Sequence, residues 1–119
     1  MPWHIQLGKW GEQLARTYIT EKGFCILSVN WKYSRCEIDI IASREGVLHF
    51  IEVKTRSNTR FGFPEESVDK QKMKRLMQAA EQYLYLHPHW KRVQYDVLAI
   101  SLSKDRSPEF FVIEDVYLD

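Results

Sequence analysis

Cysteine is scarce in this sequence. The 119 residues include only two cysteines, Cys25 and Cys36, and these form no CxxC pair. Two thiols are too few for a disulfide framework, and their spacing does not suit a zinc site. The four histidines show no metal-ligand spacing either. The length predicts a single domain over residues 1–119, held together by a hydrophobic core in which Cys25 is expected to lie.

The sequence also lacks an N-terminal basic-then-apolar signal and any run approaching 18 apolar residues. Together with the absence of a disulfide framework, this predicts a cytoplasmic protein with reduced thiols and no membrane partner. The net charge is +1, so no overall field marks a broad binder of nucleic acid or membrane. Charge is nevertheless concentrated in residues 54–75, where seven basic and three acidic residues give +4 and leave −3 elsewhere. This segment predicts either an anion-binding patch or an ordinary solvated helix face with a polar loop.

Hydrophobic periodicity predicts two helices and five strands. One helix spans about His4–Lys22 and ends before Gly23, and the other spans about Asp69–Leu86 and ends before Pro88. The order is helix, three strands, helix, two strands, which predicts an α/β domain with a mixed sheet, helices covering its faces and an antiparallel hairpin at its centre. The expected strands are Phe24–Trp31, Glu37–Ser43, Val47–Thr55, Val93–Leu102 and, after a KDRSP turn, the weaker Glu109–Val116.

The hairpin CEIDIIASREGVLHFIEVKTR, residues 36–56, carries charged residues inside strands that should be apolar. If Glu45-Gly46 is a two-residue turn, the residue numbers of cross-strand partners sum to 91. Asp39 then faces Glu52, and Glu37 faces Lys54. Alternation along each strand places these four residues on one face. The opposite face is predicted to belong to the core and consists of Ile38, Ile40, Ile51 and Val53.

Carboxylates directly opposite each other destabilise a sheet unless they take up a proton or a cation. Oxygen ligands of Asp39 and Glu52 suit a hard divalent ion such as Mg²⁺ or Mn²⁺. Lys54 would lie beside that ion, where it could hold a water nucleophile or neutralise a phosphate. The pattern therefore indicates metal-assisted phosphodiester hydrolysis. The alternative is a solvent-exposed sheet face with a Glu37–Lys54 ion pair, which explains Asp39 opposite Glu52 poorly.

The spacing EID, twelve residues, EVK resembles the D-x(n)-ExK signature of the PD-(D/E)xK nuclease superfamily, which has a restriction-endonuclease-like αβββαβ core. A wider pattern over residues 8–100 resembles the YraN-like bacterial family, an uncharacterised protein family. The segments that carry it are GKWGEQLARTYITEKGFCILSVNW, EIDIIA, FIEVKTR, FGFPEESV, KMKRLMQAAEQYL and YDVLAI. The layout is also similar to that of archaeal Holliday-junction resolvases, which place a glutamate in the N-terminal helix.

The resemblance implies roles at individual positions. Glu12 matches the helix glutamate at the edge of the active site, as a catalytic residue and a further metal ligand. Asp39 matches the metal-binding aspartate, and Glu52 and Lys54 match the ExK pair. Lys72 matches a basic residue on the second helix. Two positions depart from the pattern, because Cys36 stands where the family usually has glycine and Ile38 where the superfamily has proline.

Four basic residues are predicted to contact nucleic acid. Arg56 continues the Lys54 face, Arg60 lies in the loop of residues 57–64, and Lys72 and Arg75 lie three apart on one helical flank. The alternative for Arg56 is a solvated strand end. For the loop that contains Arg60, the favoured alternative is hydrophobic anchoring of the loop to the domain, and Lys72 and Arg75 would otherwise form an ordinary solvated helix face.

Two functions remain open from the sequence. The first is a nuclease dependent on Mg²⁺ or Mn²⁺ that acts on DNA in preference to RNA, on branched or damaged structures. The second is a noncatalytic nucleic-acid-binding or scaffolding domain. The intact Asp39, Glu52 and Lys54 favour the nuclease. The near-zero net charge favours a partner, a homodimer or a small footprint over broad duplex binding.

Overall fold

The computed structural model describes residues 3–56, 69–103 and 105–116, with side chains in the first helix described from residue 8. Two helices and five strands follow in the predicted order, so the α/β class with a mixed sheet is confirmed. No helix in these ranges is both long and apolar enough to cross a membrane. The elements are α1 (Trp3–Glu21), β1 (Cys25–Tyr33), β2 (Cys36–Arg44), β3 (Val47–Arg56), α2 (Lys70–Leu86), β4 (Val93–Ser103) and β5 (Arg106–Ile113).

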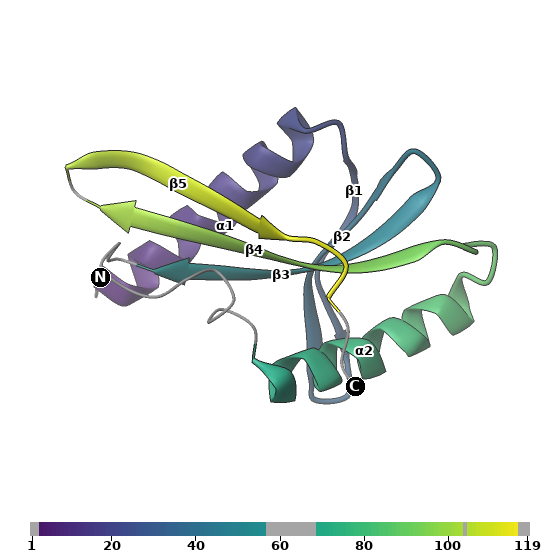
Figure 1. Cartoon of the computed structure of the whole chain (residues 1–119). Helices are drawn as coiled ribbons and strands as arrows, with labels where there is room; N and C mark the ends of the chain where they lie inside the picture. Colours follow the sequence, from purple (N-terminus) through teal and green to yellow (C-terminus); the bar gives the residue numbers. More distant parts are fainter. Residues whose placement is uncertain (1–2, 57–68, 104, 117–119) are drawn as a thin grey trace.

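The five strands form one sheet in sequence order, β1-β2-β3-β4-β5 (Figure 1). All neighbouring strands are antiparallel except β3 and β4, which are parallel. A parallel pair needs a crossover connection, and α2 lies within it. Asp69 begins this helix as its N-cap, because its side chain accepts hydrogen bonds from the backbone N–H groups of Gln71 and Lys72. The crossover therefore brings the basic start of α2 back toward β3.

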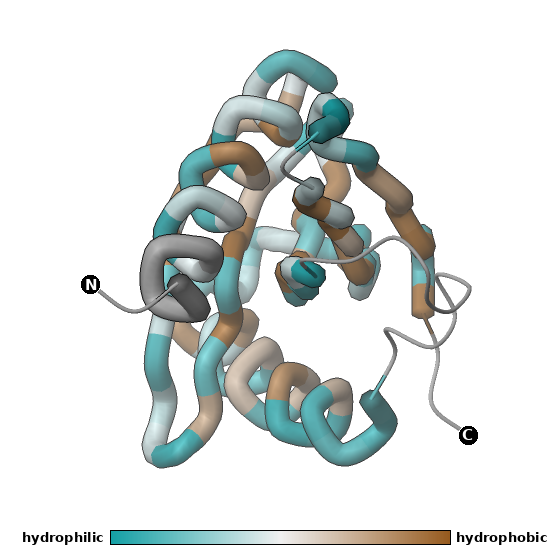
Figure 2. The backbone as a smooth tube through the Cα atoms, turned by 90° about the vertical axis from the view of Figure 1, so that its left-hand side faces the viewer, coloured by the Kyte–Doolittle hydropathy of each residue, from teal (hydrophilic) through white to brown (hydrophobic). Residues whose placement is uncertain are grey.

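Two apolar clusters form the core, and each helix packs into one of them. Figure 2 shows α1 and α2 along different sides of the strands. The cluster under α1 contains Ala15, Ile19, Ile40, Ala42, Ile51, Leu98, Ile100 and Leu102. The cluster under α2 contains Cys36, Ile38, Ile41, Leu48, Phe50, Met73, Leu76, Ala79, Ala80, Tyr83, Val97 and Val116.

A close approach fixes α1 against the end of β3. Gly11 is buried, and a Cβ atom at this position would overlap the side chain of Thr55. Only glycine therefore lets the helix lie at this distance from the strand. The next residue, Glu12, is held beside the end of β3 that carries Glu52 and Lys54.

The predicted hairpin register is confirmed near its turn. The pairs run from Arg44–Val47 to Ile40–Ile51, and each sums to 91. Glu45 and Gly46 have φ values of 52° and 80°, the left-handed conformation at both positions that a two-residue type I′ turn requires.

The register prediction fails beyond Ile40–Ile51, where the β2–β3 ladder of the described strands ends. Asp39 and Glu52 are therefore not a ladder pair. The predicted common core face is also wrong for one residue, because Ile38 joins the α2 cluster whereas Ile40 joins the α1 cluster. The reason is that β2 parts from β3 at Asp39, so the regular alternation of faces is interrupted there.

Two further predictions need correction. Cys25 was expected in the core but is exposed at the start of β1, where the neighbouring Ile26 packs against the α1 cluster instead. β5 begins at Arg106 rather than Glu109, because Arg106 already pairs with Ser103 of β4. Most of the segment expected to be a turn is therefore strand.

Candidate functional site

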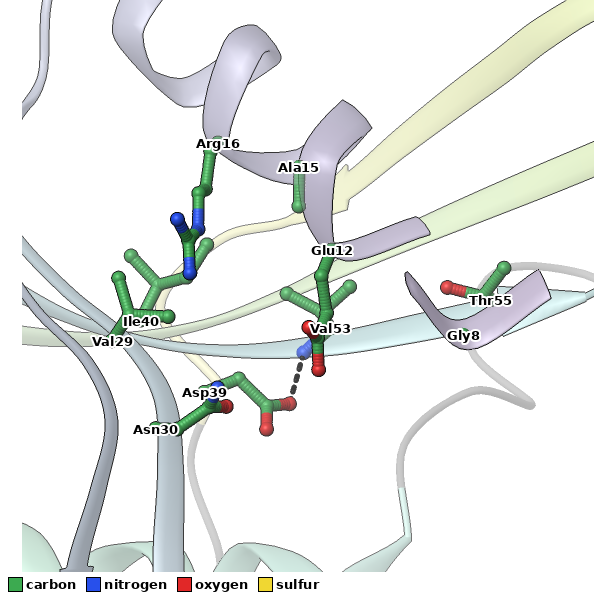
Figure 3. A pocket seen from close by; sticks show the side chains of 10 residues that line it. All are labelled: Gly8, Glu12, Ala15, Arg16, Val29, Asn30, Asp39, Ile40, Val53 and Thr55. Atoms are coloured by element: carbon green, nitrogen blue, oxygen red, sulfur yellow. Dashed lines mark hydrogen bonds between the residues drawn. The ribbon is translucent and has the colours of Figure 1, made fainter. Parts of the chain in front are cut away.

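Asp39 lies at the point where β2 parts from β3. Its Oδ2 accepts a hydrogen bond of 2.8 Å from the backbone N–H of Val53 (Figure 3). A side-chain oxygen thus bonds the β3 backbone just beyond the last ladder pair. This bond holds the carboxyl group in the gap between the two strands.

Asp39 lines two small cavities. The first, of about 160 Å³, lies against α1 and is also lined by Glu12, Arg16, Asn30 and Thr55. The second, of about 170 Å³, lies against α2 and is lined by Arg35, Cys36, Glu37, Glu52, Lys72 and Arg75. Asp39 is the one side chain that these two cavities share among the described residues. A ligand in either cavity, on the α1 side or on the α2 side, could therefore reach Asp39.

Glu52 is the buried acid of the site, with 7% of its surface exposed. Its Oε1 lies 3.3 Å from Nζ of Lys72, which reaches over from α2. Lys54 lies close enough to Lys72 for the two amines to influence each other's charge. Within the described ranges, the Glu37–Lys54 ion pair of the alternative interpretation is not formed, and Glu52 pairs with Lys72 instead.

Asp39 and Glu52 lie close enough for the charge of Glu52 to affect the pKa of Asp39. Burial, the charge of Glu52 and a hydrogen bond between the two carboxyl groups together raise the pKa of Asp39 to about 7. The Val53 N–H opposes this rise but does not cancel it. Asp39 and Glu52 are therefore close enough for one proton to be retained near neutral pH, although they are not ladder partners.

The pKa values of Lys54 and Lys72 are shifted in opposite directions. Burial lowers the pKa of Lys54, and the nearby charge of Lys72 lowers it further. Burial also acts to lower the pKa of Lys72, but the charge of Glu52 and hydrogen bonds to Lys54 and Glu52 outweigh burial and raise it. Lys72 is thus the cation that balances Glu52, whereas Lys54 is the more readily deprotonated amine.

The raised pKa of Asp39 predicts a pH dependence of stability in the metal-free protein. The unfolded chain loses this proton near pH 3.8 and the folded protein near pH 7, so the folded state holds more protons in between. The free energy of unfolding therefore falls as pH rises through this window, by on the order of 3 kcal/mol. Asp39→Asn keeps an acceptor for Val53 and cannot ionise. In chelator, we expect it to melt higher than the wild type at pH 8, with the difference shrinking at pH 5.

Other titrating groups affect both proteins alike, so the difference between the two melting curves isolates Asp39. A difference that stays constant from pH 5 to pH 8 would contradict the assignment. Thermal unfolding followed by circular dichroism measures it.

Glu12 is exposed on α1, and its carboxylate points into the same space as Asp39 in Figure 3. However, the described residues contain no group of three or more histidine, cysteine or acidic side chains that could hold a metal ion. The expected ligand set of Glu12, Asp39 and Glu52 is therefore not preassembled. Asp39 and Glu52 do fit a hard divalent cation, because two neighbouring carboxyl groups that favour uptake of a proton can take up such an ion in its place.

The remaining predicted residues are distributed around this pair. Arg75 lines the cavity against α2, together with Lys72. Arg56 is half-buried at the end of β3, outside both cavities at Asp39. Arg60 lies outside the described residues.

Sequence reasoning missed three residues at the site, namely Arg16, Asn30 and Arg35. Arg16 follows Glu12 by four residues, which is the spacing of neighbours on one helix face and could have identified it. Asn30 has a φ of 53°, a conformation that asparagine tolerates better than most residues. Arg35 lies in the turn between β1 and β2, and no local signal pointed to it.

A protein-family comparison assigns most of the chain to one family. The sequence model described as uncharacterised protein family UPF0102 matches residues 11–100. The chain belongs to this family. The matched region contains Glu12, Asp39, Glu52, Lys54 and Lys72, and the YraN-like resemblance is thereby confirmed.

Relatives that bear the name UPF0102 protein come from distant bacteria. The protein of Bacteroides thetaiotaomicron is 43% identical over 97 residues, which cover 82% of this chain and 80% of the relative. That of Dictyoglomus thermophilum is 42% identical over 100 residues, with 83% and 85% covered. That of Rhodococcus opacus is 36% identical over 118 residues, with 98% and 100% covered.

Among solved structures, the chain is similar to Hjc, a Holliday junction resolvase of Archaeoglobus fulgidus. The TM-score is 0.49 at 16% identity, and the match covers 87% of this chain and 74% of that one.

Proposed function

We propose that this protein is a nuclease that hydrolyses DNA phosphodiesters with the help of Mg²⁺ or Mn²⁺. The observation that carries the proposal is the half-buried Asp39 next to the buried Glu52 at the strand split, where mutual repulsion favours retention of a proton and where Lys72 pairs with Glu52 and Lys54 lies beside Lys72. Buried acids that repel each other are unfavourable for stability alone. Their arrangement is explained if a cation takes the place of the proton.

Each residue has a distinct role in this proposal. Asp39 and Glu52 would hold the cation, which would take its other ligands from water and a substrate phosphate. A divalent cation supplies Lewis acidity that activates water and offsets negative charge on the scissile phosphate. Lys54 donates hydrogen bonds to the attacking water or to the phosphate, and its lowered pKa makes proton transfer easier than it is for an ordinary lysine. Glu12 approaches from α1 and orients water on the other side of Asp39.

The noncatalytic alternative also has one observation in its favour. Lys72 already neutralises Glu52 in the metal-free site, so the charges do not depend entirely on a cation. A domain that only binds nucleic acid would retain this ion pair and would cleave nothing. The two functions therefore make different predictions about divalent ions.

Divalent cations are expected to stabilise the folded protein. If Mg²⁺ binds with a Kd of about 1 mM, then roughly 10 mM Mg²⁺ adds about 1.4 kcal/mol to the free energy of unfolding. For a domain of this size, the melting temperature should rise by about 4–6 °C. Asp39→Asn should lose most of this rise, because it removes a charged ligand. Thermal unfolding at ionic strength matched with NaCl measures the effect.

The control is the same scan with a short DNA oligonucleotide, which can supply ligands that the free protein lacks. A wild-type melting curve that Mg²⁺ and Mn²⁺ leave unmoved, both with and without the oligonucleotide, would remove the basis for a metal site.

Activity itself is tested with fluorescent substrates. We expect the wild-type protein to cleave at least one member of a panel of single-stranded, duplex, flap and four-way DNA in Mn²⁺ or Mg²⁺. The flap and four-way substrates are included because the sequence resembles junction resolvases. A single-stranded RNA of matched length is added so that cleavage of RNA can be compared with cleavage of DNA. Asp39→Asn prepared in parallel controls for contaminating nucleases. Equal cleavage by both proteins, or cleavage of no substrate by either, would contradict the proposal.

A further inference from the structure

A groove of about 620 Å³ runs between the β1–β2 turn and α2. It shares Arg35, Cys36 and Arg75 with the cavity that contains Asp39 and Glu52, so the two are continuous. The nuclease proposal uses only the acidic end of this continuous surface. The rest of the groove, between the β1–β2 turn and α2, has no role in the nuclease proposal.

The chemistry of the groove changes along its length. Arg35 and Arg75 stand at the junction with the acidic cavity, where their guanidinium groups can meet phosphate oxygens in the planar geometry that suits them. Farther along, Tyr33 and Tyr85 line the groove with 44% and 79% of their surfaces exposed. Rings this exposed contribute little to the core. They are available to a ligand.

The helix presents these groups on one side. Arg75, Gln78 and Tyr85 follow one another at spacings of three and seven residues, which keeps them on one face of α2. Gln78 is fixed from the strand side, because its Oε1 accepts a hydrogen bond of 3.5 Å from Sγ of Cys36. One wall of the groove thus carries a cation near the acids and an aromatic ring farther away. Glu81 is the acidic member of the lining and reduces its net charge to +1.

We propose that this groove binds the single-stranded segment of nucleic acid that adjoins the cleaved phosphodiester. The proposal rests on the function proposed above, because the nuclease site defines where the strand must pass. Arg35 and Arg75 hold backbone phosphates, and unpaired bases stack on Tyr33 and Tyr85. Stacking needs a free base face, which a duplex does not offer. The net charge of +1 also supports a short single-stranded footprint rather than broad contact with a duplex.

The test measures binding separately from cleavage. Fluorescence anisotropy in chelator, where no cation supports cleavage, compares labelled oligo-dT, oligo-U and a duplex of equal length. Tyr33→Ala and Tyr85→Ala are each expected to weaken binding of oligo-dT by about 5-fold or more. Tyr85→Phe should bind as the wild type does, because it keeps the ring. Duplex affinity should change by less than about 2-fold.

Matched variants separate stacking from general effects. Phe111 is an aromatic residue on β5 with 41% of its surface exposed, outside this groove, so Phe111→Ala should leave binding unchanged. Arg35→Ala should weaken binding at low salt and flatten its salt dependence. Melting curves test whether each variant is folded. Tyr85→Ala should keep the stability of the wild type, because Tyr85 is mostly exposed.

The outcomes distinguish the groove from the nuclease. If the tyrosine variants weaken oligo-dT binding while the wild type cleaves nothing, the groove is supported and the proposed activity is wrong. If oligo-dT does not bind, or if Tyr85→Ala binds as tightly as the wild type, the groove proposal is overturned whatever the cleavage assay shows. Equal weakening of single-stranded and duplex binding would also overturn it. Preference for oligo-U over oligo-dT would identify RNA as the strand that the groove holds.

Discussion

Asp39→Asn is expected to lower the single-turnover rate of DNA cleavage by about 10³-fold or more, because loss of one charged ligand removes several kcal/mol of transition-state stabilisation. The substitution is nearly isosteric, and its amide oxygen can still accept the Val53 hydrogen bond. Folding is therefore retained. Affinity for DNA in chelator should not fall, since the change removes a negative charge. The combination of lost rate and kept affinity is the expected signature of a transition-state role.

Two further variants define the roles of the lysines. Lys54→Ala should resemble Asp39→Asn, because its proposed contacts form with the reacting groups. Lys72→Ala should weaken DNA binding and reduce its salt dependence, while also leaving Glu52 without its ion-pair partner. Glu45→Gln serves as the charge-matched control, since this carboxylate is exposed in the hairpin turn away from the site. Full activity in Asp39→Asn, with the control also active, would place the chemistry elsewhere.

Asp96→Ala is expected to have the largest effect on stability, a loss of about 3–4 kcal/mol. Asp96 is a buried residue of β4 with 3% of its surface exposed. Its Oδ2 lies 2.6 Å from Nδ1 of buried His49 on β3, and its Oδ1 accepts hydrogen bonds from Gln94 Nε2 at 3.0 Å and from the backbone N–H of Asp115 at 2.9 Å. Alanine removes the acceptor for all three. His49 would then lie in the core without its polar partner.

The measurement is chemical and thermal unfolding followed by circular dichroism. The melting temperature of Asp96→Ala should fall by about 10–15 °C. Asp96→Asn should lose less, because it keeps one oxygen acceptor. Asp105→Ala is the matched control, as an exposed aspartate whose removal should change stability by less than about 0.5 kcal/mol. A melting temperature of Asp96→Ala within about 3 °C of the wild type would show that the polar cluster does not stabilise the fold.

The hairpin illustrates how far local chemistry predicts structure. Glu45-Gly46 is a two-residue turn with positive φ at both positions, of which Gly46 adopts this conformation without strain, and the turn sets the register of the strands it joins. The same local rules predict both helices, and the second was expected to begin at about Asp69, one residue before its observed start at Lys70. The element order and the family follow from patterns of this kind. They depend on neighbours in sequence, so the sequence by itself determined them.

The site required the tertiary structure. Asp39 and Glu52 were predicted to meet as ladder partners, but they interact where the ladder has already ended, because β2 leaves β3 at Asp39. The contact of Lys72 with Glu52 depends on α2 returning across the sheet. The pairing of His49 with Asp96 depends on the parallel register of β3 and β4.

None of these contacts is encoded in the spacing of nearby residues. They arise from the twist of the sheet and from the packing of a helix 20 residues away in the chain, since Lys72 and Glu52 are that far apart. The turn sets the register of the residues next to it, and it no longer constrains the two strands where their ladder ends at Ile40–Ile51. For that reason the residue types of the site could be identified from the sequence, while their arrangement was decided by the fold.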